Sequence, residues 1–295
     1  MKIPSIESIL TGAEKNHQTL WQYILQSEFE DSGMPVDQII RRVEETYTVM
    51  RNAVRSGLQE HGRSLSGLTG GDAFKYYERI ETGRTVLSDF NAKAIAYAIA
   101  TNEHNASMGV IVAAPTAGAS GILPGVLIAA QEEFGYMDSD IVHSLIVASG
   151  IGAVIATRAT VSGAAGGCQA ECGSAAAMAA GALTYLLGGN DQQVMHAAAL
   201  ALKNCLGLAC DPVAGLVEIP CIKRNGVYAS MAITACDMAL SGIVSFIPPD
   251  EVIDAMFQIG SMMPACIRET AEGGLAVTPT GLAAKERVFG VKKEK

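Results

Sequence analysis

Apolar side chains recur at steps of three or four residues along the early part of the chain, and this spacing places them on one face of an α-helix. The clearest run begins after Pro35 and predicts an amphipathic helix that ends near Gly62. Two further helices are predicted over residues 72–80 and 88–102. The apolar positions of the first run are Ile39, Val43, Tyr47, Met50, Val54 and Leu58.

A cluster of Gly, Ser and Thr at residues 64–71 separates the long helix from the next one. Residues of these types favour turns and loops, so the cluster predicts a hinge. We therefore expect two units, an N-terminal helical arm of residues 1–63 and a larger domain of residues 64–295.

From about Met108 onward the chain is rich in Ala and Gly, which predicts a compact core of helices that approach closely. Asn190 is a cap for a helix over residues 191–204, and a helix over residues 173–187 ends at two glycines. Pro248-Pro249-Asp250 opens a further helix. Because the Val/Ile/Thr alternation of strands is almost absent, we predict an all-α fold.

The longest apolar stretch, residues 141–157, is short for a membrane span and contains His143. We interpret it as a buried helix and expect no membrane association. The N-terminus has no visible export signal, which favours a cytoplasmic protein. A formal net charge of -9 provides no basic stripe for a phosphate backbone, so nucleic-acid binding is disfavoured.

The seven cysteines all lie after residue 167. An odd number concentrated in one region argues against a disulfide framework and for reduced thiols. Cys168, Cys210 and Cys221 stand at turn-forming positions near Gly or Pro. Three thiolates can hold a metal cluster and leave one iron open to a substrate.

Two other interpretations of the cysteines stay open at this level. Cys168 and Cys172 form a C-x3-C pair and Cys205 and Cys210 form a C-x4-C pair, spacings that also suit a structural zinc site. Small cysteines are also common in plain protein cores. The core interpretation is preferred for Cys236 and Cys266.

The segment 114–121 is rich in glycine and hydroxyl side chains and precedes an apolar helical run. Such a loop presents free backbone N–H groups to a carboxylate or phosphate. Thr116, Gly118 and Ser120 are therefore candidate substrate-binding residues. The alternative is a tight turn that needs glycine for backbone reasons.

Two cationic side chains lie near the cysteines in the sequence. Arg224 follows Cys221 by three positions and is a candidate clamp for a substrate carboxylate. Lys203 is a candidate base for proton removal. The plainer alternatives are a solvated loop charge for Arg224 and a charge that complements the helix dipole for Lys203.

Longer motifs surround these residues: Ala114-Pro-Thr-Ala-Gly118, Gly167-Cys-Gln-Ala-Glu171, and the run from Leu206 through Cys210-Asp-Pro-Val to Cys221. Together they resemble the α chain of iron–sulfur L-serine dehydratases. Segments 102–109 and 269–276 fit the same pattern. The likeness covers most of the chain from about residue 65 onward.

The resemblance implies a 4Fe–4S cluster bound by Cys168, Cys210 and Cys221, with the fourth iron free to bind substrate. It makes residues 64–295 the iron–sulfur catalytic domain. Single-chain relatives carry a regulatory α/β domain ahead of the catalytic part and end in a cysteine that can occupy the open iron. This chain starts near the catalytic region and its tail, residues 289–295, lacks a cysteine. We therefore expect a separate β chain in an oligomeric assembly, and no inhibition by a tail cysteine.

The implied reaction converts L-serine to pyruvate and ammonia. It needs loss of a weakly acidic α-proton and departure of hydroxide, which a Lewis acid on the hydroxyl assists. Lys203 is the candidate base. Two alternatives are an L-cysteine desulfidase with the same cluster chemistry and, from another class, a zinc-stapled helical interaction protein. The residues expected to orient the amino acid are Thr116, Gly118, Ser120 and Arg224.

Overall fold

The computed structural model describes residues 3–59 and 62–290. Within these ranges the chain forms thirteen α-helices, several short 3-10 turns and one π-helical turn, and no β-strand. One isolated parallel bridge joins Cys210 and Arg268. The all-α prediction is confirmed. The tail of residues 289–295 was noted above for its lack of a cysteine. Its residues 291–295 lie outside the described part of the chain.

Five helices form the first part of the chain: α1 (Ile6–Lys15), α2 (Leu20–Ser32), α3 (Val36–Gln59), α4 (Asp72–Glu81) and α5 (Asp89–Ala106). α3 is the long helix predicted from the spacing of apolar residues. Its apolar face, which includes Tyr47 and Met50, is buried against α5, α6 and α7. α4 and α5 are the other two helices that the sequence predicts in this region.

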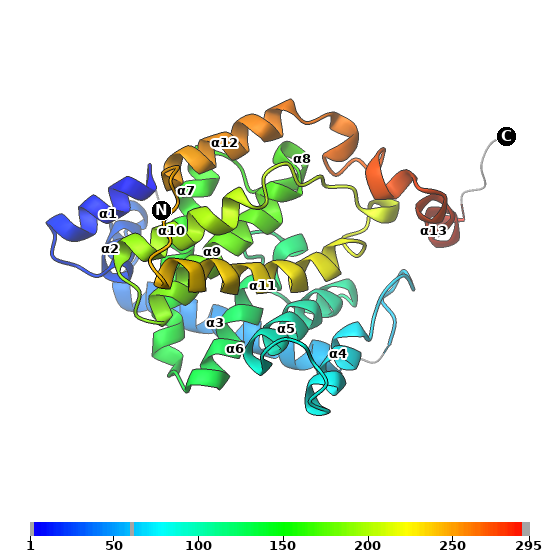
Figure 1. Cartoon of the computed structure of the whole chain (residues 1–295), viewed down its shortest axis with the longest axis horizontal. Helices are drawn as coiled ribbons and strands as arrows, with labels where there is room; N and C mark the ends of the chain where they lie inside the picture. The colour runs from blue at the N-terminus through cyan, green and yellow to red at the C-terminus, as the bar shows by residue number, and fades with distance from the viewer. Residues whose placement is uncertain (1–2, 60–61, 291–295) are drawn as a thin grey trace.

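The centre of the molecule contains α6 (Ile122–Phe134), α7 (Asp138–Arg158), α9 (Ser174–Leu186), α10 (Asp191–Lys203) and α11 (Cys221–Leu240). α9 contacts the other four, and almost all of its side chains are buried (Figure 1). Small residues allow such close packing. At Gly121, before the start of α6, a Cβ atom would collide with the carbonyl oxygen of Ala98 in α5.

The apolar stretch that the sequence predicts as a buried helix lies in α7. This helix is long and apolar enough to cross a membrane, but two thirds of its most apolar window is buried inside the protein. The prediction of a buried helix is confirmed.

The predicted cap of α10 is also present, because the side chains of Asn190 and Gln193 each accept the other's backbone N–H at 2.9 Å.

The last two helices are α12 (Pro249–Met262), which packs on α10, and α13 (Pro279–Phe289). Pro249 is the first residue of α12, as predicted. Between them, residues 263–278 form short 3-10 turns that lie beside the loop of Cys210. The short α8 (Gly163–Gly166) directly precedes the segment of Cys168.

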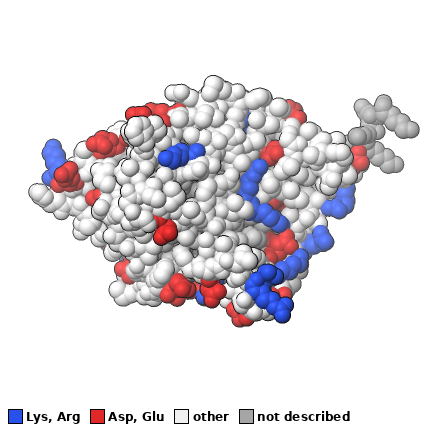
Figure 2. All heavy atoms as spheres, in the orientation of Figure 1, with Lys and Arg blue, Asp and Glu red and all other residues white. Residues whose placement is uncertain are grey.

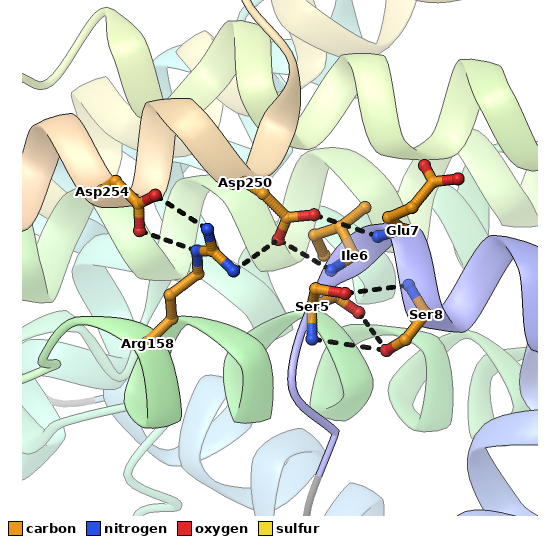
Figure 3. A network of polar contacts seen from close by, with 7 residues as sticks. All are labelled: Ser5, Ile6, Glu7, Ser8, Arg158, Asp250 and Asp254. Carbon is orange, nitrogen blue, oxygen red and sulfur yellow. Dashed lines mark hydrogen bonds and ion pairs between the residues drawn. The ribbon is translucent and has the colours of Figure 1, made fainter.

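The N-terminal helices share the hydrophobic core of the rest of the molecule, since buried side chains of α1, α2 and α3 belong to the same cluster as those of α9. Polar contacts join the two regions (Figure 3). Asp250 of α12 accepts the backbone N–H groups of Ile6 at 2.9 Å and Glu7 at 3.1 Å, and Arg158 pairs with Asp254 at 2.7 Å. The boundary at residue 63 between an arm and a domain stays a prediction.

Most of the face shown in Figure 2 carries neither basic nor acidic side chains. Lys and Arg gather toward the side of the molecule that carries α4, with Asp and Glu among them. Although the net charge of the chain is -9, the charged side chains in this part of the face are of both signs.

Candidate metal centre

Cys168 stands at the start of a π-helical turn, Gln169–Gly173, that leads into α9. A π-helical turn widens the helix locally and is often found at functional sites. All five residues of this turn are buried. The turn brings the Cys172 sulfur within 3.4 Å of the Cys168 sulfur.

Cys210 lies in the loop after α10, and the C-terminal segment holds its backbone on both sides. The Cys210 N–H donates to the carbonyl of Ile267 at 2.9 Å, and the Glu269 N–H donates to the carbonyl of Cys210 at 2.7 Å. The Cys210 thiol lies 3.6 Å from Oε2 of Glu171. The possible ligand atoms of Cys168, Glu171 and Cys210 all lie within 4.8 Å of one another.

Cys221 is the first residue of α11 and is 5% exposed. Burial raises the pKa of its thiol to about 12, and the negative charges of Cys168 and Glu171 add to the increase. Cys221 therefore faces the same buried site, although it does not belong to the tight group of three ligand atoms. None of the seven cysteines, all of which are described, forms a disulfide.

The site stabilises one thiolate. Hydrogen bonds from the thiols of Cys172 and Cys210, together with the charge of Arg224, lower the pKa of Cys168 to about 3. Donation to Cys168 correspondingly raises the pKa values of Cys172 and Cys210. A buried thiolate with thiol donors and a guanidinium around it is a ready ligand for a soft metal centre.

Glu171 is a residue that sequence reasoning did not assign to the site. Burial raises its carboxyl pKa to about 7; the nearby Thr116 hydroxyl opposes this rise, and the charges of Cys168 and Glu269 add to it. A Cβ atom at Gly163 would touch both carboxylates, so Glu171 and Glu269 lie close together. The signal in the sequence was its position three residues after Cys168, which one helical turn places beside the ligand.

Arg224 is half-buried and already holds protein acceptors. Its Nη1 donates to the carbonyl of Ala209 at 2.9 Å, and its Nη2 donates to Oδ1 of Asp211 at 3.2 Å. Asp211 also accepts the backbone N–H of Leu275 at 2.8 Å. Arg224 thus supports the loop of Cys210, a contact that the sequence did not reveal, while its predicted role as a substrate clamp stays a prediction.

The loop 114–121 lies against the same site. The side-chain amide of Asn225, one turn after Cys221, donates to the carbonyl of Gly118 at 2.7 Å, and its oxygen accepts the N–H of Gly121 at 2.9 Å. A Cβ atom at Gly118 would lie 3.3 Å from Oε1 of Glu171. The structure therefore brings this part of the predicted substrate loop next to the cysteines.

The two hydroxyl side chains of this loop have different surroundings. The Thr116 hydroxyl is buried near Glu171 but makes no hydrogen bond of standard geometry within the described part of the chain. The Ser120 hydroxyl is fully buried and already has two partners, since it donates to the carbonyl of Ala117 at 2.8 Å and accepts from the side-chain amide of Asn102 in α5 at 3.2 Å. Of the two hydroxyl groups, the one of Thr116 is therefore the one that lies near the Glu171 carboxylate.

Lys203 and Cys205 lie at the end of α10. The Lys203 ammonium donates to Ser245 at 3.4 Å in the connection between α11 and α12. The Cys205 thiol donates to the carbonyl of Ala201 at 3.4 Å, and burial raises its pKa to about 12. These contacts give Cys205 the surroundings of a core cysteine and leave the proposed role of Lys203 as a base a prediction.

Comparisons with a family model and with individual proteins point to the same family. Residues 15–276 match the family described as "Serine dehydratase alpha chain". The chain is 48% identical to the "Probable L-serine dehydratase, alpha chain" of Bacillus subtilis, over 97% of this chain and 95% of that protein. It is 43% identical to the "L-serine dehydratase, alpha chain" of Peptoniphilus asaccharolyticus, over 89% of this chain and 90% of that protein. A longer relative, the "L-serine dehydratase" of Streptomyces coelicolor, is 42% identical, and the match covers 86% of this chain and 56% of that protein.

Proposed function

The chain belongs to the family of serine dehydratase alpha chains, and from this premise we propose that it is the catalytic subunit that converts L-serine to pyruvate and ammonia on a 4Fe–4S cluster. The relatives carry the name of the lyase reaction. The buried group of Cys168, Cys210 and Glu171 is the observation that supports a metal centre for it.

The residues of the site fit an iron–sulfur cluster. Cys168, Cys210 and Cys221 are free, buried thiols, and thiolates are the usual ligands of such clusters. Arg224 provides a positive charge that favours thiolate over thiol at Cys168. When bound, the cluster supplies a Lewis acid that assists departure of the substrate hydroxyl.

The proposed role of the loop 114–121 is to hold the amino acid. The buried hydroxyl of Thr116 has no standard hydrogen-bond partner among the described residues, so it is ready to donate to a substrate carboxylate. Gly118 leaves room beside Glu171 because it has no side chain. Ser120 contributes by fixing the loop, and Arg224 adds positive charge for the carboxylate. Lys203 is the proposed base for the α-proton.

We also propose that the chain acts in the cytoplasm together with a separate β chain that carries a regulatory α/β domain. The designation of two relatives as alpha chains supports a second chain in their assemblies. The test is copurification of the chain with a candidate β chain under oxygen-free conditions. Serine turnover that requires both chains is the expected result.

The proposed function is tested by metal analysis and turnover. Protein prepared without oxygen should hold about four irons per chain with a brown colour that bleaches in air, as exposed cluster iron predicts. Replacement of Cys210 by Ser should abolish both the cluster and pyruvate formation from serine. A colourless wild-type chain that holds zinc, or iron and turnover retained in C210S, would contradict the proposal.

The same assay separates the nearest enzymatic alternative. A cysteine desulfidase would form pyruvate and sulfide from L-cysteine faster than it forms pyruvate from L-serine. We expect the opposite preference, because the relatives are serine dehydratases. Their names also argue against a zinc-stapled interaction protein.

A further inference from the structure

A second buried carboxylate lies close to the cysteines in the sequence but belongs to a different network. Glu218, three residues before Cys221, is 6% exposed. Its Oε2 accepts hydrogen bonds from the hydroxyl groups of Ser64 at 2.6 Å, Ser66 at 2.9 Å and Thr69 at 2.7 Å. No cation of the described residues pairs with it, so these three hydroxyls are the donors that compensate for its burial.

The three donors come from the segment that the sequence predicts as a hinge. In the structure this segment is fastened at several points. Ser64 donates its N–H to the carbonyl of Thr69 at 2.9 Å, which closes the loop on itself. At its far end, Glu103 accepts the N–H groups of Asp72 at 2.9 Å and Ala73 at 3.1 Å, which fixes the start of α4.

Glu218 connects the segment of Ser64, Ser66 and Thr69 to the start of α11. Its backbone carbonyl accepts the N–H of Ile222 at 3.0 Å, so Glu218 closes the first helical turn, which contains Cys221. The Val213 N–H donates to the carbonyl of Ile219 at 2.9 Å and closes the preceding loop. Glu218 therefore holds Ser64 through its side chain and the first turn of α11 through its backbone.

A second contact joins the same two segments on the outer side. Lys223 pairs with Asp72 at 2.6 Å, two residues after Cys221 and at the start of α4. On the inner side, Asn225 donates to the carbonyl of Cys221 at 2.9 Å and holds the loop 114–121. The beginning of α11 is thus held between two loops.

This arrangement matters because the three candidate ligands are not held in the same way. Cys168 and Cys210 form a tight group with Glu171, whereas Cys221 lies outside that group and depends on the position of α11. Binding of one cluster by all three requires a fixed separation between Cys221 and the other two thiols.

We propose that Glu218 is a positioning residue, which by accepting the hydroxyl groups of Ser64, Ser66 and Thr69 fixes the first turn of α11 and holds the Cys221 thiol where the metal centre needs it. The role in cluster binding rests on the proposed function. The fixing of Cys221 by Glu218 does not, because it concerns contacts present in the protein without metal.

The first test therefore uses the full-length chain without metal. Alkylation of Cys221 is followed by peptide mass spectrometry in the wild type, in Glu218→Gln and in Thr69→Val, which removes one donor with little change in shape. An amide is a weaker acceptor than a carboxylate for the three hydroxyl groups, so Cys221 alkylation should increase about tenfold in Glu218→Gln and less in Thr69→Val, which loses one donor. Cys236, in the later part of the same helix, should be unaffected and serves as the internal control.

Asp250→Asn is the matched control variant. Asp250 also joins distant segments through its carboxylate, but the segments are α12 and the start of α1, and its hydrogen bonds go to Ile6 and Glu7 (Figure 3). It should lower the unfolding temperature and leave Cys221 alkylation at the wild-type rate. Equal acceleration at Cys221 and Cys236 in Glu218→Gln, or no acceleration at Cys221, would overturn the proposal.

The double variant Glu218→Gln/Thr69→Val shows whether the two residues act through one contact. If they do, the increase in Cys221 alkylation in the double variant should be smaller than the product of the two single increases, because both substitutions weaken the same hydrogen bond. Multiplicative effects would show that Thr69 acts independently of Glu218 and would contradict the proposed contact. If Glu218→Gln does not fold, as circular dichroism would show, Thr69→Val and Ser64→Ala carry the same comparison.

The second test measures the consequence for the metal centre. In protein loaded without oxygen, Glu218→Gln should lose iron to a chelator about tenfold faster than the wild type, and Asp250→Asn should lose it at the wild-type rate. Fast Cys221 alkylation with unchanged iron loss would overturn the positioning role at the metal. A wild-type chain that binds no cluster would instead contradict the proposed function, and the alkylation result would still decide whether Glu218 fixes Cys221.

Discussion

At the scale of single residues, the electrostatics of the candidate metal centre depend mainly on two charged groups, the Cys168 thiolate and the Arg224 guanidinium. Hydrogen bonds with Cys172 and Cys210 lower the pKa of Cys168 and favour its thiolate, and Arg224 supplies the positive charge. Arg224 also holds the Cys210 loop through Ala209 and Asp211. One side chain therefore links the electrostatics of the site to the backbone that carries a ligand.

Replacement of Arg224 by Ala removes both the positive charge and the hydrogen bonds to the Cys210 loop, whereas replacement by Lys keeps the charge. We expect the KM for L-serine to rise at least about tenfold, because a charged hydrogen-bonding group near the substrate carboxylate is lost. Arg224→Lys should be intermediate, since it keeps the charge but lacks the planar fork. Steady-state kinetics on loaded enzyme is the measurement, with Arg51→Ala, at a surface ion pair with Asp138, as the control. An unchanged KM in Arg224→Ala would remove Arg224 from the substrate site.

At the scale of elements, short connections determine where the site residues lie. The π-helical turn before α9 brings Cys168 and Cys172 together, and the first turn of α11 carries Cys221. The start of α4 touches the latter through the ion pair of Asp72 and Lys223. Connections of this kind place the ligands, while the helices behind them supply a rigid frame.

The ion pair at the start of α4 makes stability depend on pH. Burial alone would raise the pKa of Asp72, but hydrogen bonds and charges from Lys223 and Lys75 outweigh it and lower the pKa. A lowered pKa in the folded state stabilises the protein above the unfolded value of 3.8, and this contribution is lost as pH falls through the folded-state value.

Asp72→Asn should therefore lower the free energy of unfolding by about 0.5 kcal/mol near neutral pH, a small effect because the pair is partly exposed and screened by water. The difference from the wild type should shrink as pH falls below about 4. Denaturant unfolding at several pH values is the measurement. A difference that stays constant with pH would show that the Asp72 charge is not its source.

At the scale of the whole molecule, the N-terminal helices and the central helices share one hydrophobic cluster. Ile24 of α2 is completely buried in it, and a Cβ atom at Gly150 of α7 would collide with this side chain. The single tryptophan, Trp21, stacks on His143 of α7 with ring centroids 3.9 Å apart. α2 and α7 are therefore closely packed.

Ile24→Ala should destabilise the protein by roughly 2–5 kcal/mol, the usual cost of a cavity at a fully buried site. Trp21 fluorescence reports the packing of α2 on α7, and far-UV circular dichroism reports all helices. Coincident transitions in the two signals are expected if the shared cluster unfolds as one unit. A fluorescence transition that precedes loss of most helical signal would instead support the separate arm of residues 1–63.

Local patterns in the sequence were sufficient for much of this protein. The spacing of apolar residues predicted α3, the cap at Asn190 predicted the start of α10, and the near absence of Val/Ile/Thr alternation predicted the all-α fold. These features depend on contacts within one or two helical turns, which a short stretch of sequence specifies completely. The motifs around the cysteines likewise indicated the family that the comparisons identify.

Only the tertiary structure placed the Glu171 carboxylate beside Cys210, 39 positions away, and the Glu218 carboxylate on Ser64, 154 positions away. It also gave Arg224 protein partners where the sequence suggested a free clamp, and it connected the predicted hinge to the start of α11. These pairings depend on how the helices pack, and helix periodicity contains no information about which distant loop will meet a given carboxylate. The sequence by itself determined the helices and the reactive residue types, whereas their meeting in one buried site was decided by the packing of the whole chain.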